Sequence, residues 1–94
     1  MALKGLRKFD NAVERFREVI VHQPDHVGAL NNLGTTLDGL INKDEALFSL
    51  QKAAKLMPED YVIVFNLAKR QTDFHEWENA ELNYRKVLEI NNNF

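Results

Sequence analysis

The side chains that could bind a metal ion do not form a recognisable site. No two of the three histidines, His22, His26 and His75, share a helical face, and Pro24 separates the first two. His75 and Glu76 lack the second histidine, four residues on, that a zinc-binding helix requires. We therefore expect no metal ion and no metal-dependent chemistry.

A phosphate-binding loop is only superficially suggested by the stretch GTTLDG, residues 34–39. Leu40 and Ile41 stand where lysine and Ser/Thr would be needed to hold phosphate and a metal. Carboxylates occur in pairs at expected helix starts, where negative charge is favourable: Asp44 with Glu45, and Glu76 with Glu78. No Ser/His/Asp arrangement is readable, so we expect neither an enzyme nor a cofactor.

Composition predicts one small globular domain. The chain has 94 residues, of which 28% are charged and 45% apolar, which disfavours disorder and fibre classes. Its 12 basic and 14 acidic side chains are scattered, so no basic patch indicates a nucleic-acid partner. No apolar run is long enough for a secretory signal or a membrane span. We expect no membrane partner and a cytoplasmic location, although the lack of cysteine fits either redox compartment.

The chain repeats with a period of 34 residues. Pro24 and Pro58 are one period apart, and Gly34 falls in the same register as Ala68. Three further registers hold apolar residues throughout: Ala12, Ala46 and Ala80; Phe16, Leu50 and Tyr84; and Val19, Ala53 and Val87. Glycine inside a helix costs about 1 kcal/mol relative to alanine. A register that holds only glycine and alanine therefore indicates a place where two helices approach closely.

Within each period, apolar residues recur at helical spacing, which predicts two helices per repeat. One stripe runs Leu30, Leu33, Leu37 and Leu40, and a second runs Ala46, Leu47, Leu50, Ala53 and Ala54. We expect capping by Asn42 with Glu45, and by the segments 24–25 and 58–60. The predicted helices are Phe9 to His22, Val27 to Leu40, Asp44 to Leu56, Tyr61 to Phe74, and Glu76 to Ile90.

These helix pairs resemble the tetratricopeptide repeat (TPR) family. The residues that carry the resemblance in the central repeat are Leu30, Leu33, Gly34, Leu37, Ala46, Leu50, Ala53 and Pro58. The last repeat matches at Val64, Leu67, Ala68, Ala80, Tyr84 and Val87, but departs from the pattern at Gln71 and Asn92. The leading segment matches at Leu3, Ala12, Phe16, Val19 and Pro24 and lacks nearly all of its first helix.

The resemblance implies an all-α fold of antiparallel helix-turn-helix repeats stacked as a right-handed α-solenoid. The single domain 1–94 then divides into a partial repeat 1–26, a full repeat 27–60 and a degenerate repeat 61–94. A similar class of helical repeats binds RNA. The small residues, the proline and the sparse basic charge favour the TPR pattern instead.

The resemblance further implies a concave groove, lined by the first helix of each repeat, that binds a peptide or a partner helix. The predicted groove residues are Asn31, Asn32, Thr35, Phe65, Asn66, Lys69 and Asp73. Asn32 and Asn66 share a register, and an amide can bond a peptide main chain as donor and acceptor. These asparagines could equally bond a neighbouring repeat. The family's clamp for carboxylate tails is not matched, because Val62 replaces a basic residue.

The incomplete first repeat predicts an exposed apolar face. Val13, Phe16, Val19 and Ile20 would be only partly covered by the short segment from Ala2 to Leu6. We expect either a longer array or self-association as a homodimer or a domain-swapped oligomer. At the other end, Glu81 replaces Val13 and Leu47, which predicts a polar, capped outer face.

The sequence thus predicts a non-catalytic protein-protein interaction scaffold. Two alternatives remain open at this point. The chain could be the repeat segment of a larger multidomain enzyme, such as a glycosyltransferase that recruits substrates through repeats. It could also be a self-assembling TPR array without a separate ligand. Phe9 and Trp77 share a register and are expected to pack in corners between helices.

Overall fold

The computed structural model describes residues 2–37 and 40–91, with side chains from residue 11 onward. Its elements are α1 (Ala2–His22), α2 (Val27–Thr36), the 3-10 helix η1 (Leu40–Asn42), α3 (Lys43–Leu56), α4 (Tyr61–Asp73) and α5 (Trp77–Ile90). The described ranges contain no strand. The predicted all-α class is confirmed, and each predicted helix has a counterpart.

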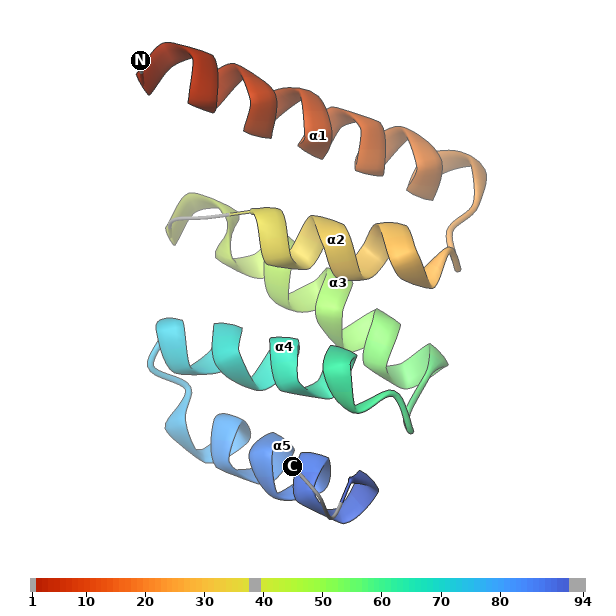
Figure 1. Ribbon diagram of the computed structural model, residues 1–94, viewed down its shortest axis with the longest axis vertical. Helices are drawn as coiled ribbons and strands as arrows, with labels where there is room; N and C mark the ends of the chain where they lie inside the picture. Colours follow the sequence, from red (N-terminus) through yellow and green to blue (C-terminus); the bar gives the residue numbers. More distant parts are fainter. Residues whose placement is uncertain (1, 38–39, 92–94) are drawn as a thin grey trace.

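Successive helices run back and forth and pack against their neighbours (Figure 1). Contacts join α1 to α2, α2 to α3, α3 to α4 and α4 to α5, and α2 also contacts α4. The molecule measures 40 × 28 × 23 Å, with α1 and α5 at opposite ends of the long axis (Figure 1). The contact between α2 and α4 brings together two helices that are one period apart in the sequence.

Two predicted helix boundaries are wrong by more than one residue. The first helix begins at Ala2, not Phe9, so residues 2–6 continue α1 and are not the remnant of a separate helix that covers it. The second helix ends at Thr36, not Leu40, because Leu37 is extended with ψ of 132°. Leu40 therefore leaves the predicted apolar stripe and is 81% exposed.

The helix caps agree only in part with the prediction. Asp60 caps α4 as expected, since its side chain accepts from the backbone N–H of Val62 at 3.1 Å. At α2 the cap is His26, whose Nδ1 accepts from the Ala29 N–H at 3.0 Å. The side chain of Asn42 forms no cap bond at α3, so the predicted capping box with Glu45 is absent.

The close approach of α2 and α3 at Gly34 confirms the predicted steric limit. A Cβ atom on Gly34 would collide with the side chain of Leu50 and lie 3.0 Å from the carbonyl oxygen of Ala46. Ala68, in the same register on α4, is fully buried. Larger residues pack around these contacts in three clusters, centred on Leu33 and Leu37, on Leu30 and Ile63, and on Leu50 and Leu67.

Gln71, which departs from the TPR pattern, is buried with a hydrogen-bond partner. Its Oε1 accepts from Asn83 Nδ2 at 2.7 Å, which joins α4 to α5. The same two registers hold Leu37 and Ser49 in the preceding helix pair. Asn83, which has an amide where Ser49 has a hydroxyl, therefore supplies the hydrogen-bond partner that the buried Gln71 side chain needs.

The turn between α4 and α5 uses a histidine where the backbone favours glycine. His75 has φ of 64°, the left-handed region. Its N–H donates to the Thr72 carbonyl at 3.1 Å, and the Glu76 N–H donates to the Gln71 carbonyl at 2.8 Å. These two bonds form the Schellman motif that ends a helix, and glycine usually occupies the left-handed position of this motif. His75 is therefore the left-handed turn residue between α4 and α5.

Replacing His75 with glycine should stabilise the protein by about 1 kcal/mol, because glycine adopts the left-handed conformation without a Cβ penalty. The measurement is urea unfolding followed by circular dichroism. His75→Ala is the control. His75→Ala removes the ring that lies 5.1 Å from the Trp77 ring but keeps the Cβ, so it should not increase the free energy of unfolding. Equal stability of the two variants would contradict the argument.

Candidate functional site

The faces of α2 and α4 that lie side by side are joined by an amide pair. Asn66 Nδ2 on α4 donates to Asn31 Oδ1 on α2 at 3.1 Å, and both residues are half-buried. This hydrogen bond connects neighbouring repeats, which is the alternative to peptide binding that the sequence left open for these asparagines. Each side-chain amide has further hydrogen-bonding capacity beyond this single bond.

Arg70 on α4 binds the C-terminal end of α2. Its Nε donates to the Gly34 carbonyl at 3.2 Å and its Nη2 to the Thr35 carbonyl at 2.5 Å. The last carbonyls of a helix have no partner within the helix, and positive charge is favourable there. Nη1 also donates to Asp73 Oδ2 at 3.3 Å. The guanidinium is therefore held in one orientation, with only 18% of the side chain exposed.

A hollow of about 160 Å³ lies between the two helices. Its lining residues are Thr35, Asn66, Lys69, Arg70 and Asp73. The structure thus brings together four of the seven predicted groove residues, and it adds Arg70. The sequence contained one signal for Arg70, since it follows Asn66 by four residues and so lies on the same face of α4.

The hollow carries a small excess of positive charge. Arg70 and Asp73 form an ion pair. Lys69 is exposed and has no ion-pair partner within the described part of the chain. The hollow therefore offers the exposed ammonium group of Lys69, the fixed guanidinium of Arg70 and the amide of Asn66, all of which can donate hydrogen bonds.

The three other predicted groove residues lie outside the lining of this hollow. Asn31 lies next to it through its bond to Asn66. Asn32 is exposed on α2, and its backbone carbonyl accepts from the Thr35 hydroxyl at 3.2 Å. Phe65 packs edge-on against Tyr84 of α5, with ring centroids 5.8 Å apart. Phe65 is therefore committed to packing within the α4–α5 pair.

The residues predicted to mediate self-association are covered to different degrees. Val13 is buried against Leu33 and Leu37. Phe16 and Ile20 are partly buried and pack against the same core, and Val19 is also partly buried. Among the described side chains, the coverage of Val13 and Phe16 comes from α2 and from Ala46 of α3. Self-association through the remaining exposed parts stays a prediction.

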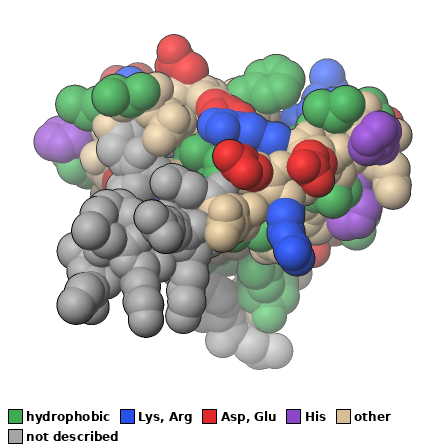
Figure 2. All heavy atoms as spheres, turned by 90° about the horizontal axis from the view of Figure 1, so that it is seen from above, with side chains coloured by type: hydrophobic (Ala, Val, Ile, Leu, Met, Phe, Trp, Pro, Cys, Tyr) green, Lys and Arg blue, Asp and Glu red, His purple; other side chains and the backbone are tan. Residues whose placement is uncertain are grey.

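An ion pair fixes α1 to α3. Arg17 donates to both carboxylate oxygens of Glu45, at 2.9 Å from Nε and 2.6 Å from Nη2. Its hydrogen bond to Glu45 raises the pKa of Arg17 above the ordinary arginine value. Seen from the α1 end, side chains of both charge signs are intermingled over the described surface (Figure 2).

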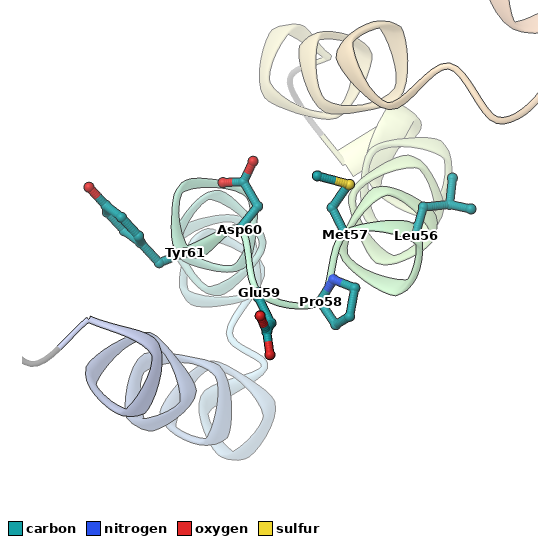
Figure 3. Close-up of a pocket in the computed structure, with 6 residues that line it drawn as sticks. All are labelled: Leu56, Met57, Pro58, Glu59, Asp60 and Tyr61. Carbon is teal, nitrogen blue, oxygen red and sulfur yellow. The ribbon is translucent and has the colours of Figure 1, made fainter.

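A larger hollow of about 590 Å³ lies at the turn between α3 and α4, lined by residues 56–61. Its side chains point in different directions around the turn, and those of Leu56 and Tyr61 point away from each other (Figure 3). This hollow is therefore a poorer candidate for specific binding than the one at Arg70, where polar groups converge.

No group of three or more His, Cys, Asp or Glu side chains among the described residues is placed to hold a metal ion. None of the helices in the described ranges combines the length and apolarity needed to cross a bilayer.

Comparisons with family models and with curated proteins give no match to this chain.

Removing the Arg70 side chain should destabilise the protein by about 2 kcal/mol, because two helix-end carbonyls lose a charged donor. The expected result for Arg70→Ala is a lower urea midpoint with an unchanged slope. Arg70→Lys is the matched control. It keeps the charge but cannot hold two carbonyls with one planar group, so it should recover only part of the loss. A loss below about 0.5 kcal/mol for Arg70→Ala would mean that the contact contributes little.

Proposed function

We propose that this chain is a TPR-type repeat scaffold, built as a short right-handed solenoid, that binds an extended peptide or a partner helix along α2 and α4 without catalysis. Two features support the fold assignment. The 34-residue period coincides with helix pairs α2–α3 and α4–α5, and the small-residue register lies at a close helix approach.

The observation that carries the proposal is the hollow between α2 and α4. Its volume of about 160 Å³ suits one side chain or a short stretch of main chain, not an enclosed small molecule. The lining combines donors at Asn66, Lys69 and Arg70 with an acceptor at Asp73. A peptide main chain presents both donors and acceptors, so this mixture suits it.

The rigidity of the α2–α4 contact also supports the proposal. Asn66 and Arg70 hold the two helices together through three hydrogen bonds, to Asn31, Gly34 and Thr35. A surface fixed in this way loses little conformational entropy when a ligand binds. Exposed Lys69 and Asn32 flank the fixed groups and can adapt to the side chains of the ligand.

A peptide selection tests the proposed function. A library of random twelve-residue peptides is selected on the immobilised chain, and the recovered peptides are titrated into ¹⁵N-labelled protein. We expect chemical-shift changes confined to α2 and α4, and at least a tenfold loss of affinity in Asn66→Ala, because a ligand hydrogen bond and the fixed amide pair are both lost.

Asn79→Ala provides the matched control for this experiment. Asn79 is an exposed asparagine on α5 whose side chain bonds Glu76 at 3.4 Å, away from the hollow. Its replacement should leave the affinity unchanged. Selected peptides whose binding is unaffected by Asn66→Ala, or whose shifts lie away from α2 and α4, would refute the proposed site.

A further inference from the structure

The helices α1, α3 and α5 are related by the 34-residue period. On α1 and on α3, residues at equivalent positions form an apolar stripe that packs against the helix that follows in the chain. On α1 the stripe consists of Val13, Phe16 and Ile20, which pack on α2. On α3 the residues one period later are Leu47, Leu50 and Ala54, and they pack against Leu67 and Phe74 of the following repeat. The stripe is therefore the element that couples one helix pair to the next.

On α5 the same stripe is covered by a described helix only at Tyr84, which packs against Phe65 of α4. Its residues are Glu81, Tyr84 and Leu88, and Trp77 lies on the same face, four residues before Glu81. The only helix that contacts α5 is α4 within the described ranges. Trp77 and Leu88 are 58% and 52% exposed. The prediction of a polar, capped end is therefore wrong for half of this stripe, and Trp77 does not pack in a corner as expected.

Arg85 adds an ionic element to the exposed stripe. It stands two periods after Arg17, the residue that binds Glu45 across the first helix junction. Lacking such a carboxylate, Arg85 pairs with Glu81 of its own helix at 2.6 Å, and both side chains are more than 60% exposed. An exposed pair of this kind contributes little to stability, so Arg85 can exchange its partner at small cost.

We propose that the exposed part of the α5 stripe, defined by Trp77, Glu81, Arg85 and Leu88, is a docking surface for an amphipathic helix pair of another polypeptide. The first helix of that partner carries a leucine ridge with the spacing of α2. The second helix begins with a carboxylate that forms an ion pair with Arg85, as Glu45 does with Arg17. Because Glu81 then loses its own partner, the docking helix carries a basic residue opposite it. This surface lies on α5, so the proposal does not depend on the groove.

A second copy of this chain is a poor occupant of the α5 stripe. The leucine ridge of α2, formed by Leu30, Leu33 and Leu37, is buried in the folded chain, in part against α1. It could dock elsewhere only if α1 detached, which would uncover the contacts of Val13, Phe16 and Ile20. A helix pair from a different polypeptide avoids that cost.

The first test uses a synthetic peptide with the sequence of residues 27–60, which carries the α2 ridge and Glu45, and the intact ¹⁵N-labelled chain. We expect shift changes at the Trp77 indole and along α5. Glu81→Leu should tighten binding about tenfold, since the probe has no basic residue there and restoring leucine adds apolar contact. Leu88→Glu should abolish binding, and Arg85→Gln should weaken it.

Leu82→Glu is the matched control, because Leu82 is similarly exposed on α5 but lies about 120° around the helix from Leu88, outside the stripe. It should not change the affinity. Shift changes confined to α1, or equal losses for Leu82→Glu and Leu88→Glu, would overturn the proposal.

A second format decides the outcome if the free peptide is too unstructured to bind. The same 34 residues are appended directly after Phe94, which keeps the period because position 95 follows Val27 by two repeats. We expect the fluorescence emission of Trp77 to shift to shorter wavelength as the ring becomes covered, and Leu88→Glu to reverse the shift. Unchanged emission in the appended chain would overturn the proposal.

Discussion

The contact between the α2 backbone at Gly34 and the Leu50 side chain of α3 fixes the distance between the two helices, and the other features of the fold follow from that distance. No side chain beyond hydrogen fits at Gly34, because a Cβ would meet Leu50 and the Ala46 carbonyl. The surrounding leucines can then interlock above and below the contact. The packing offsets the conformational cost of a glycine inside a helix.

The same glycine links helix packing to the candidate site. Its backbone carbonyl, together with that of Thr35, faces Arg70 of the next repeat and accepts hydrogen bonds from the guanidinium. Because α2 ends at Thr36, these carbonyls lie in its last turn, where a cation is favourable. Arg70 is thereby held in place beside Asn66 and Lys69. The geometry of the hollow thus depends on where α2 ends.

The parts of the fold that follow from periodicity were predictable from the sequence. The five helices and the small residue at 34 follow from the 34-residue spacing, because helix pairs can repeat only if the packing contacts repeat. Two predicted helix caps are replaced by other local contacts. His26, not Asp25, caps α2, and Glu45 pairs with Arg17 instead of closing a capping box at α3.

The sequence predicted the helix faces on which the candidate site lies, but not the side-chain contacts within the site. The spacing along α2 and α4 placed Thr35, Asn66, Lys69 and Asp73 together, as the hollow has them. Register suggested that Asn32 and Asn66 act alike, but Asn66 bonds Asn31, and Asn32 faces solvent. The role of Arg70 could not be read from the sequence, because it depends on the early end of α2. That end is set by the extended backbone at Leu37.

The stability of Gly34→Ala tests the close approach of α2 and α3 most directly, since two effects of opposite sign compete at that residue. Helix propensity alone would make alanine more stable by about 1 kcal/mol. The contact with Leu50 and Ala46 predicts instead a net loss of about 1 to 3 kcal/mol, because the added methyl group has no space. Urea unfolding monitored by circular dichroism gives the sign. A destabilised variant is the predicted result, and a variant as stable as the parent or more stable would contradict the account.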